Sequence, residues 1–150
     1  MSFETVILAD IQLEKTQQPP VGTYVFQLLP TAEVRNNKFT QVQELNLSAA
    51  IAEGDFKGRR VFWNYPDPST VGQDGKTFAW SAQAMKKLEH VLGIDALEGE
   101  SSVDYFNRAA ASGNARFSAY FGPNAKKPYT PAGADEPRNE LNIFTVKPAA

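Results

Sequence analysis

Lysine, arginine and aromatic side chains occur together in one short stretch of the chain. The cations are Lys57, Arg59 and Arg60, and the rings that follow them are Phe62, Trp63 and Tyr65. Fixed positive charge holds phosphate groups, and aromatic faces hold unstacked bases at ~1–3 kcal/mol per base. The stretch therefore has the chemistry of a site for single-stranded nucleic acid. The alternative interpretation is a solvated basic turn followed by the aromatic residues of a core.

A β-hairpin is predicted to position these side chains. Gly54 and Gly58 bracket a tight connection, and glycine can take the positive φ angles that such a turn requires. Before the turn, apolar residues alternate with polar ones, which predicts one buried face and one wet face. The apolar set is Leu45, Leu47, Ala49 and Ile51. After the turn, one face of the strand carries Arg59, Val61, Trp63 and Tyr65, and the other carries Arg60, Phe62 and Asn64. The alternation leaves open which of these two faces is exposed.

The remaining segments predict further strands and two helices. Strands are expected at residues 21–29, 39–52, 59–65, 116–121 and 141–146, which are rich in β-branched and aromatic residues or alternate in polarity. Apolar residues at helical spacing predict a helix over 80–92 that ends at Gly93. A shorter helix is expected from a cap at Ser101 or Ser102 to Gly113. Turn-forming residues predict loops over 66–78 and 122–140.

The order of these segments predicts the fold class. Five short strands with a helix between the third and the fourth are the layout of the OB-fold. We therefore expect a mainly β protein with a five-stranded, OB-like Greek-key barrel, one main helix between strands three and four, and a second short helix. The expected boundaries are an extended N-terminal arm (1–19), the OB-like domain (20–147) and a tail (148–150). The loops that bind oligonucleotides in that fold correspond to residues 31–38 and 122–140.

Composition excludes most enzymatic and metal chemistry. The 150 residues, enough for one domain, include no cysteine and only one histidine, His90, which excludes thiolate sites and paired-histidine metal sites. No glycine-rich loop opens a helix, and there is no nucleophile elbow. We expect a protein that is not an enzyme and that uses no cofactor and no metal. Without a long apolar run or a secretory leader, we also expect no membrane association and a cytoplasmic location.

Charge is segregated along the chain although the net charge is only −2. Residues 1–34 and 89–104 are strongly acidic, whereas residues 35–88 and 105–150 each carry three more cations than anions. The basic blocks coincide with most of the predicted sheet. We therefore expect them to converge on one basic groove of an acidic protein.

Three short motifs, at residues 20–24, 53–62 and 85–93, carry a family resemblance. They are PVGTY, EGDFKGRRVF and MKKLEHVLG. In these motifs the chain resembles a family of small phage-encoded proteins that are similar to single-stranded-DNA-binding proteins and have OB-fold character. The resemblance covers residues 20–147. It implies binding of single-stranded DNA without sequence preference, a role in DNA replication or recombination, and a location in the host cytoplasm.

The candidate nucleic-acid-binding residues come from the hairpin, the two loops and the fourth strand. Phosphate contacts are expected from Arg35, Lys38, Lys57, Arg59, Arg60, Arg116, Lys126 and Lys127. Base stacking is expected from Phe39, Trp63, Tyr65, Tyr120 and Tyr129. Arg138 is set aside because Asp135, Glu136 and Glu140 are close to it in the sequence. Trp80 is expected in the core, since it begins the apolar stripe of the main helix.

Single-stranded DNA is the expected partner, and replication or recombination proteins and a second copy of the chain are left open as further partners. The alternative is a phage interaction protein that uses the same barrel to bind a host or phage protein. Tryptophan, tyrosine and arginine are the usual anchors of protein interfaces, so the same side chains suit both functions. Salt dependence separates them, because binding to phosphates releases counterions.

Overall fold

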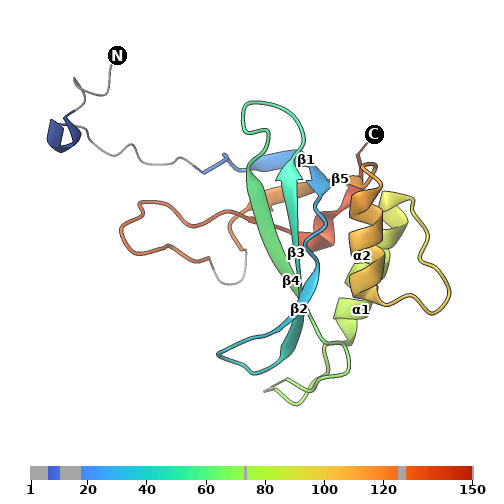
Figure 1. Cartoon of the computed structure of the whole chain (residues 1–150). Coiled ribbons are helices and arrows are strands. Elements are labelled where there is room, and N and C mark those ends of the chain that lie inside the picture. The colour runs from blue at the N-terminus through green and yellow to red at the C-terminus, as the bar shows by residue number, and fades with distance from the viewer. Residues whose placement is uncertain (1–6, 11–17, 73, 125–127, 150) are drawn as a thin grey trace.

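The structure, a computed structural model, describes residues 7–10, 18–72, 74–124 and 128–149. The paired strands run antiparallel in one open sheet, and two α-helices lie side by side on one side of that sheet (Figure 1). The strands are β1 (Gly22–Leu28), β2 (Glu33–Asn36), β3 (Gln43–Ile51), β4 (Arg60–Pro66), β5 (Arg116–Gly122), β6 (Glu140–Leu141) and β7 (Lys147–Pro148). The α-helices are α1 (Ala79–Leu92) and α2 (Ser102–Ala111), and the 3-10 turns are η2 (Leu8–Asp10) and η3 (Ile143–Thr145).

β3 forms the centre of the sheet. It pairs with β4 along one edge, from Glu44 opposite Pro66 to Ala50 opposite Arg60. Along the other edge of β3, β2 pairs with its first half and β1 with its last residues. β1 also pairs with β5. The first predicted strand therefore pairs with both the second and the fourth, as the predicted fold requires.

The core lies between the sheet and the two helices. The apolar alternation of β3 is confirmed, because Leu45, Leu47, Ala49 and Ile51 are all buried. On β4 the buried set is Val61, Trp63 and Tyr65. The Trp63 ring lies 6.0 Å from the Phe117 ring of β5, and the Tyr65 ring is stacked 6.3 Å from the Phe106 ring of α2. Each such burial stabilises the fold by ~1.5–3 kcal/mol, so these contacts determine which face of β4 is inside.

The two helices begin and end close to where the sequence predicts. α1 ends at Gly93, whose φ of 69° makes it a left-handed C-cap, and it buries Ala84, Leu88 and Leu92. α2 begins after Ser101, whose Oγ accepts a hydrogen bond from the Asp104 amide at 3.2 Å. Among the helices that the structure describes, none has the length and apolar character needed to cross a membrane.

The structure is mainly β with two helices, as predicted, but its open seven-stranded sheet differs in two places from the predicted five-stranded, OB-like barrel. Residues 33–36, expected in a loop, form β2, because the chain bends after β1 and continues along the same edge of β3. The expected last strand over 141–146 is broken after β6. There, Asn142 Oδ1 accepts a hydrogen bond from the Phe144 amide at 3.0 Å and starts η3. No ladder among the described residues joins β6 to β4, and the seven-stranded sheet stays open.

Candidate nucleic-acid interface

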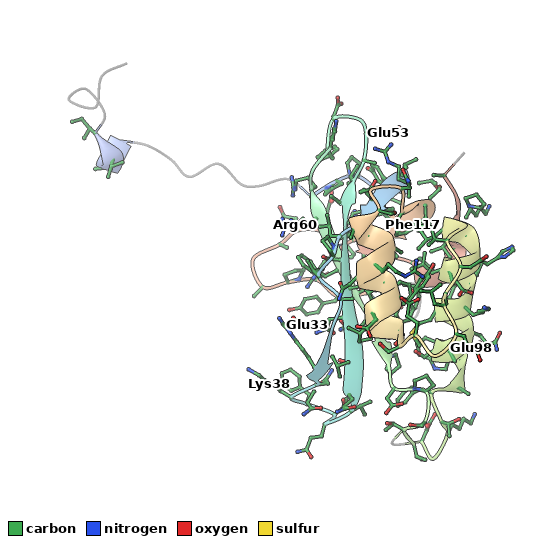
Figure 2. The ribbon with its side chains drawn as sticks, turned by 45° about the vertical axis from the view of Figure 1, so that its right-hand side comes forward. Glu33, Lys38, Glu53, Arg60, Glu98 and Phe117 are labelled. Atoms are coloured by element: carbon green, nitrogen blue, oxygen red, sulfur yellow. The ribbon has the colours of Figure 1, made fainter. Side chains whose placement is uncertain are left out.

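The outer face of the sheet, which points away from the helices, carries the polar residues of β2, β3 and β4. Figure 2 shows Glu33 and Arg60 on this side, with Lys38 at the tip of the β2–β3 loop. The register places Phe62 opposite Ser48 and Asn64 opposite Asn46 on the same face. Phe62 is 65% exposed, whereas its neighbour Trp63 is 7% exposed. The exposed face of the strand is therefore the one that carries Arg60, Phe62 and Asn64.

A smaller groove of about 430 Å³ crosses this face. Its lining includes Arg35 and Arg60, with the Phe62 ring beside them. Arg35 forms an ion pair with Glu33, and both side chains are well exposed to solvent. An exposed pair of this kind contributes only ~0–1 kcal/mol, so a phosphate group can replace the carboxylate. The smaller groove thus combines two cations with one exposed ring.

A larger groove of about 940 Å³ lies beside the first. Its walls are the β2–β3 loop, the outer side of β4, the start of α1, the β5–β6 loop and η3. Both loops that the sequence singles out border it, since Asn37 comes from one and Tyr129 and Arg138 come from the other. The β5–β6 loop is fastened to the chain before β1, because the Asn139 side chain donates a hydrogen bond to the Pro19 carbonyl at 3.0 Å.

Exposed aromatic rings line this larger groove. They are Phe62, Trp80, Tyr129 and Phe144. Trp80 stands at the start of α1, and its ring lies 5.6 Å from the Phe144 ring of η3. Lys87 holds η3 against α1 by donating a hydrogen bond from Nζ to the Phe144 carbonyl at 2.7 Å. The rings are thus presented from a strand, a helix, a 3-10 turn and a loop around one groove.

The charges of the larger groove differ from those expected for a basic groove. Among the described lining residues there is one cation, Arg138, and there are two carboxylates, Glu44 and Glu140. Glu44 accepts a hydrogen bond from Asn37 Nδ2 at 3.0 Å. Within the part of the chain that the structure describes, the Glu140 side chain forms no ion pair or hydrogen bond. Among the described residues, the positive charge of this surface is therefore concentrated on the smaller groove.

Several predicted site residues lie near these grooves. Lys38 and Phe39 are exposed on the β2–β3 loop, and Tyr129 lines the larger groove. Arg116 lies on the outer face of β5, where its Nε donates a hydrogen bond to Gln27 at 2.9 Å. The pairing places Arg116 and Arg60 in one row across four strands, about 14 Å apart at the usual strand spacing.

Other predicted residues lie elsewhere. Lys57 and Arg59 belong to the turn between β3 and β4, at the opposite end of these strands from the β2–β3 loop (Figure 1), and neither lines a groove. Tyr120 is on the outer face of β5 and also lines neither groove. Lys126 and Lys127 fall outside the described residues.

Two predicted stacking residues need correction. Trp63 and Tyr65 are 7% and 1% exposed, because they pack on Phe117 and Phe106 in the core. Trp63 borders the larger groove, but neither residue presents a free ring face on which a base can stack. Burial raises the pKa of Tyr65 to about 12, as expected of a phenol removed from water. Trp80, expected in the core, is instead 43% exposed. It lies at the first turn of α1, where its ring contacts those of Phe78 and Phe144.

Sequence reasoning did not select Phe62, Asn64 and Phe144 as site residues. The alternation of β4 contained the signal for Phe62 and Asn64, since it separated them from Trp63 and Tyr65, but it could not tell which set faces water. For Phe144 no signal existed, because its position depends on the break after β6.

Comparison with protein-family models, with curated proteins and with solved structures found no match. In the described parts of the chain, no group of three or more histidine, aspartate or glutamate side chains is placed to hold a metal ion.

Proposed function

We propose that this chain binds single-stranded DNA across the outer face of β2, β3 and β4. The observation that carries the proposal is the position of Phe62, a ring exposed in the middle of that face with Arg35 and Arg60 beside it in the smaller groove. A base stacks on the ring while its neighbouring phosphates meet the guanidinium groups. Duplex DNA does not bind in this way, because its bases are already stacked and paired.

We further propose that the sheet is an open relative of the OB-fold. Three observations support this proposal. β1 pairs with both β3 and β5. Along the chain, both helices follow β4 and precede β5. The β2–β3 and β5–β6 loops border one groove beside β4. OB-folds bind oligonucleotides on the face of their second and third strands, beside two loops of this kind.

The test is a fluorescence-anisotropy titration with a labelled single strand at several salt concentrations. Each phosphate contacted contributes about −0.7 to the slope of log K against log salt. With Arg35, Lys38, Arg60 and Arg116 taking part, the expected slope is roughly −2 to −3. A slope near zero, or equal binding of a duplex of the same length, contradicts the proposal.

A second candidate function is binding of a protein partner, and the charge of the larger groove favours it. Exposed aromatic rings beside an arginine are typical of a protein interface, and the two carboxylates of this groove disfavour phosphates but can pair with cations of a protein. A protein partner would bind with little dependence on salt and would not be displaced by oligonucleotides.

A further inference from the structure

Phe62 and Asn64 form a ridge between the two grooves, since both residues line both of them. On one side of the ridge lie Arg35 and Arg60. On the other side lie the larger groove and its aromatic rings. A single strand that stacks a base on Phe62 must therefore place its phosphates on one side of the ridge and its base edges on the other.

Electrostatics decide which side takes the phosphates. Among the described residues, the larger groove carries two carboxylates, Glu44 and Glu140, against one cation, Arg138, so its net charge disfavours a phosphate there. The smaller groove offers two guanidinium groups, and its one described carboxylate, Glu33, is already paired with Arg35. The phosphates therefore lie over the smaller groove, and the base edges point into the larger one.

The carboxylates of the larger groove suit particular base edges. A carboxylate only accepts hydrogen bonds, so it matches an exocyclic amino group such as N4 of cytosine. Thymine has a carbonyl oxygen, O4, at the same ring position and places an acceptor against an acceptor. The Asn64 amide can donate or accept, so it does not discriminate between the two bases.

Both carboxylates have acceptor capacity left for a ligand. Glu140 lies on the outer side of β6, because its neighbour Leu141 is buried, and among the described residues its side chain has no partner. Glu44 accepts one hydrogen bond, from Asn37, and a carboxylate has about four acceptor positions.

We propose that the larger groove reads base edges, and that Glu140 with Glu44 makes the chain prefer cytosine over thymine. This inference rests on the proposed function and refines it, since binding is then no longer indifferent to sequence. The preference is modest, because stacking and phosphate contacts are the same for the two pyrimidines.

The experiment compares oligodeoxycytidylate and oligothymidylate of about 15 nucleotides, near the upper end of the site size of one such domain, by fluorescence anisotropy at pH 7.5. The two ligands have the same backbone and similar rings, so their affinity ratio isolates the exocyclic groups. We expect cytosine to bind about five- to tenfold more tightly than thymine. In Glu140→Gln the ratio should fall toward unity, because an amide can rotate to donate to the carbonyl of thymine.

Glu136→Gln is the matched control. Glu136 is exposed on the loop that leads into β6 and does not line the groove, so its loss changes the net charge equally but should leave the ratio unchanged. Equal binding of the two oligonucleotides by the native chain overturns the inference and leaves the proposed function standing. Equal shifts of the ratio in both variants overturn it as well. Binding of neither oligonucleotide contradicts the proposed function itself.

Discussion

Phe62 and Trp63 are adjacent in the chain, but their side chains have opposite roles. The Phe62 ring is exposed to solvent between the two grooves, whereas the Trp63 ring packs on Phe117 on the inner side of the sheet. Since side chains alternate across a strand, neither residue can take the place of the other. Mutation of each therefore separates binding from stability.

We expect Phe62→Ala to weaken binding of single-stranded DNA by ~1–3 kcal/mol at every salt concentration, with the salt slope unchanged, because a stacking contact releases no counterions. The melting temperature of the Phe62→Ala variant should stay close to that of the native chain. Trp63→Ala should destabilise the fold by ~3–5 kcal/mol, since it leaves a cavity in the core. Anisotropy and thermal unfolding measure the two effects, and a stable Trp63→Ala variant that has lost binding would contradict the assignment.

Arg60 and Lys57 allow a matched test of the phosphate contacts. Arg60 lines the smaller groove, whereas Lys57 is exposed in the turn and lines neither groove. Arg60→Gln should make the slope of log K against log salt less negative by about 0.7, and Lys57→Gln should leave it nearly unchanged. Equal changes in the two variants would indicate general attraction to positive charge instead of a defined contact.

At the scale of elements, the connection between α1 and α2 is acidic, yet it is held in place by a cation. Arg108 on α2 donates hydrogen bonds from Nε and Nη2 to the Glu100 carboxylate at 2.7 and 2.8 Å, and Nη2 also donates to the Asp95 carbonyl. This connection lies on the far side of the molecule from Lys38 and Arg60, as the position of Glu98 in Figure 2 shows. Acidic residues here therefore do not oppose binding at the grooves.

Hydrogen bonds from Arg108 and from the Leu97 amide lower the pKa of Glu100 from the ordinary 4.5 to about 2. A lowered carboxyl pKa stabilises the fold fully above pH 4.5, and this contribution is lost as pH falls from 4.5 toward 2. Glu100→Gln should therefore melt at a lower temperature than the native chain at pH 7, with the difference closing by about pH 2. Glu98→Gln removes a charge from the same connection and is the control. Thermal unfolding of both variants across this pH range should show the pH-dependent difference in melting temperature for Glu100→Gln only.

For the molecule as a whole, the charge distribution matters more than the net charge of −2. Arg35 and Arg60 lie on the outer face of the sheet, whereas Asp95, Glu98 and Glu100 lie in the connection between the helices on the opposite side. Such a distribution orients a polyanion toward one face without making the protein attractive to nucleic acid everywhere.

Because a ligand that binds only the folded chain stabilises it, single-stranded DNA should raise the melting temperature. At a concentration one hundred times the Kd, the gain is about 2.7 kcal/mol. For a chain of 150 residues this corresponds to roughly 5–10 °C. Thermal unfolding with single-stranded and duplex DNA of equal length measures the effect, and stabilisation by the duplex alone would contradict a site built for unpaired bases.

The sequence by itself determined the local features. Alternation in β3, the glycine cap after α1 and the serine cap before α2 could be predicted, because each depends on neighbouring residues along the chain. The pattern of β4 likewise separated Phe62 from Trp63 and Tyr65. These predictions fixed which residues share a face, but not which face meets water.

Only the tertiary structure decided that question and assembled the site. β4 faces inward with Trp63 and Tyr65 because Phe117 and Phe106, which lie some 40 to 55 residues further along the chain, pack against them. The larger groove is assembled from distant segments, since Trp80 of α1 and Phe144 of η3 meet beside β4. Contacts between segments so far apart depend on packing in three dimensions, which no periodicity within a single segment encodes.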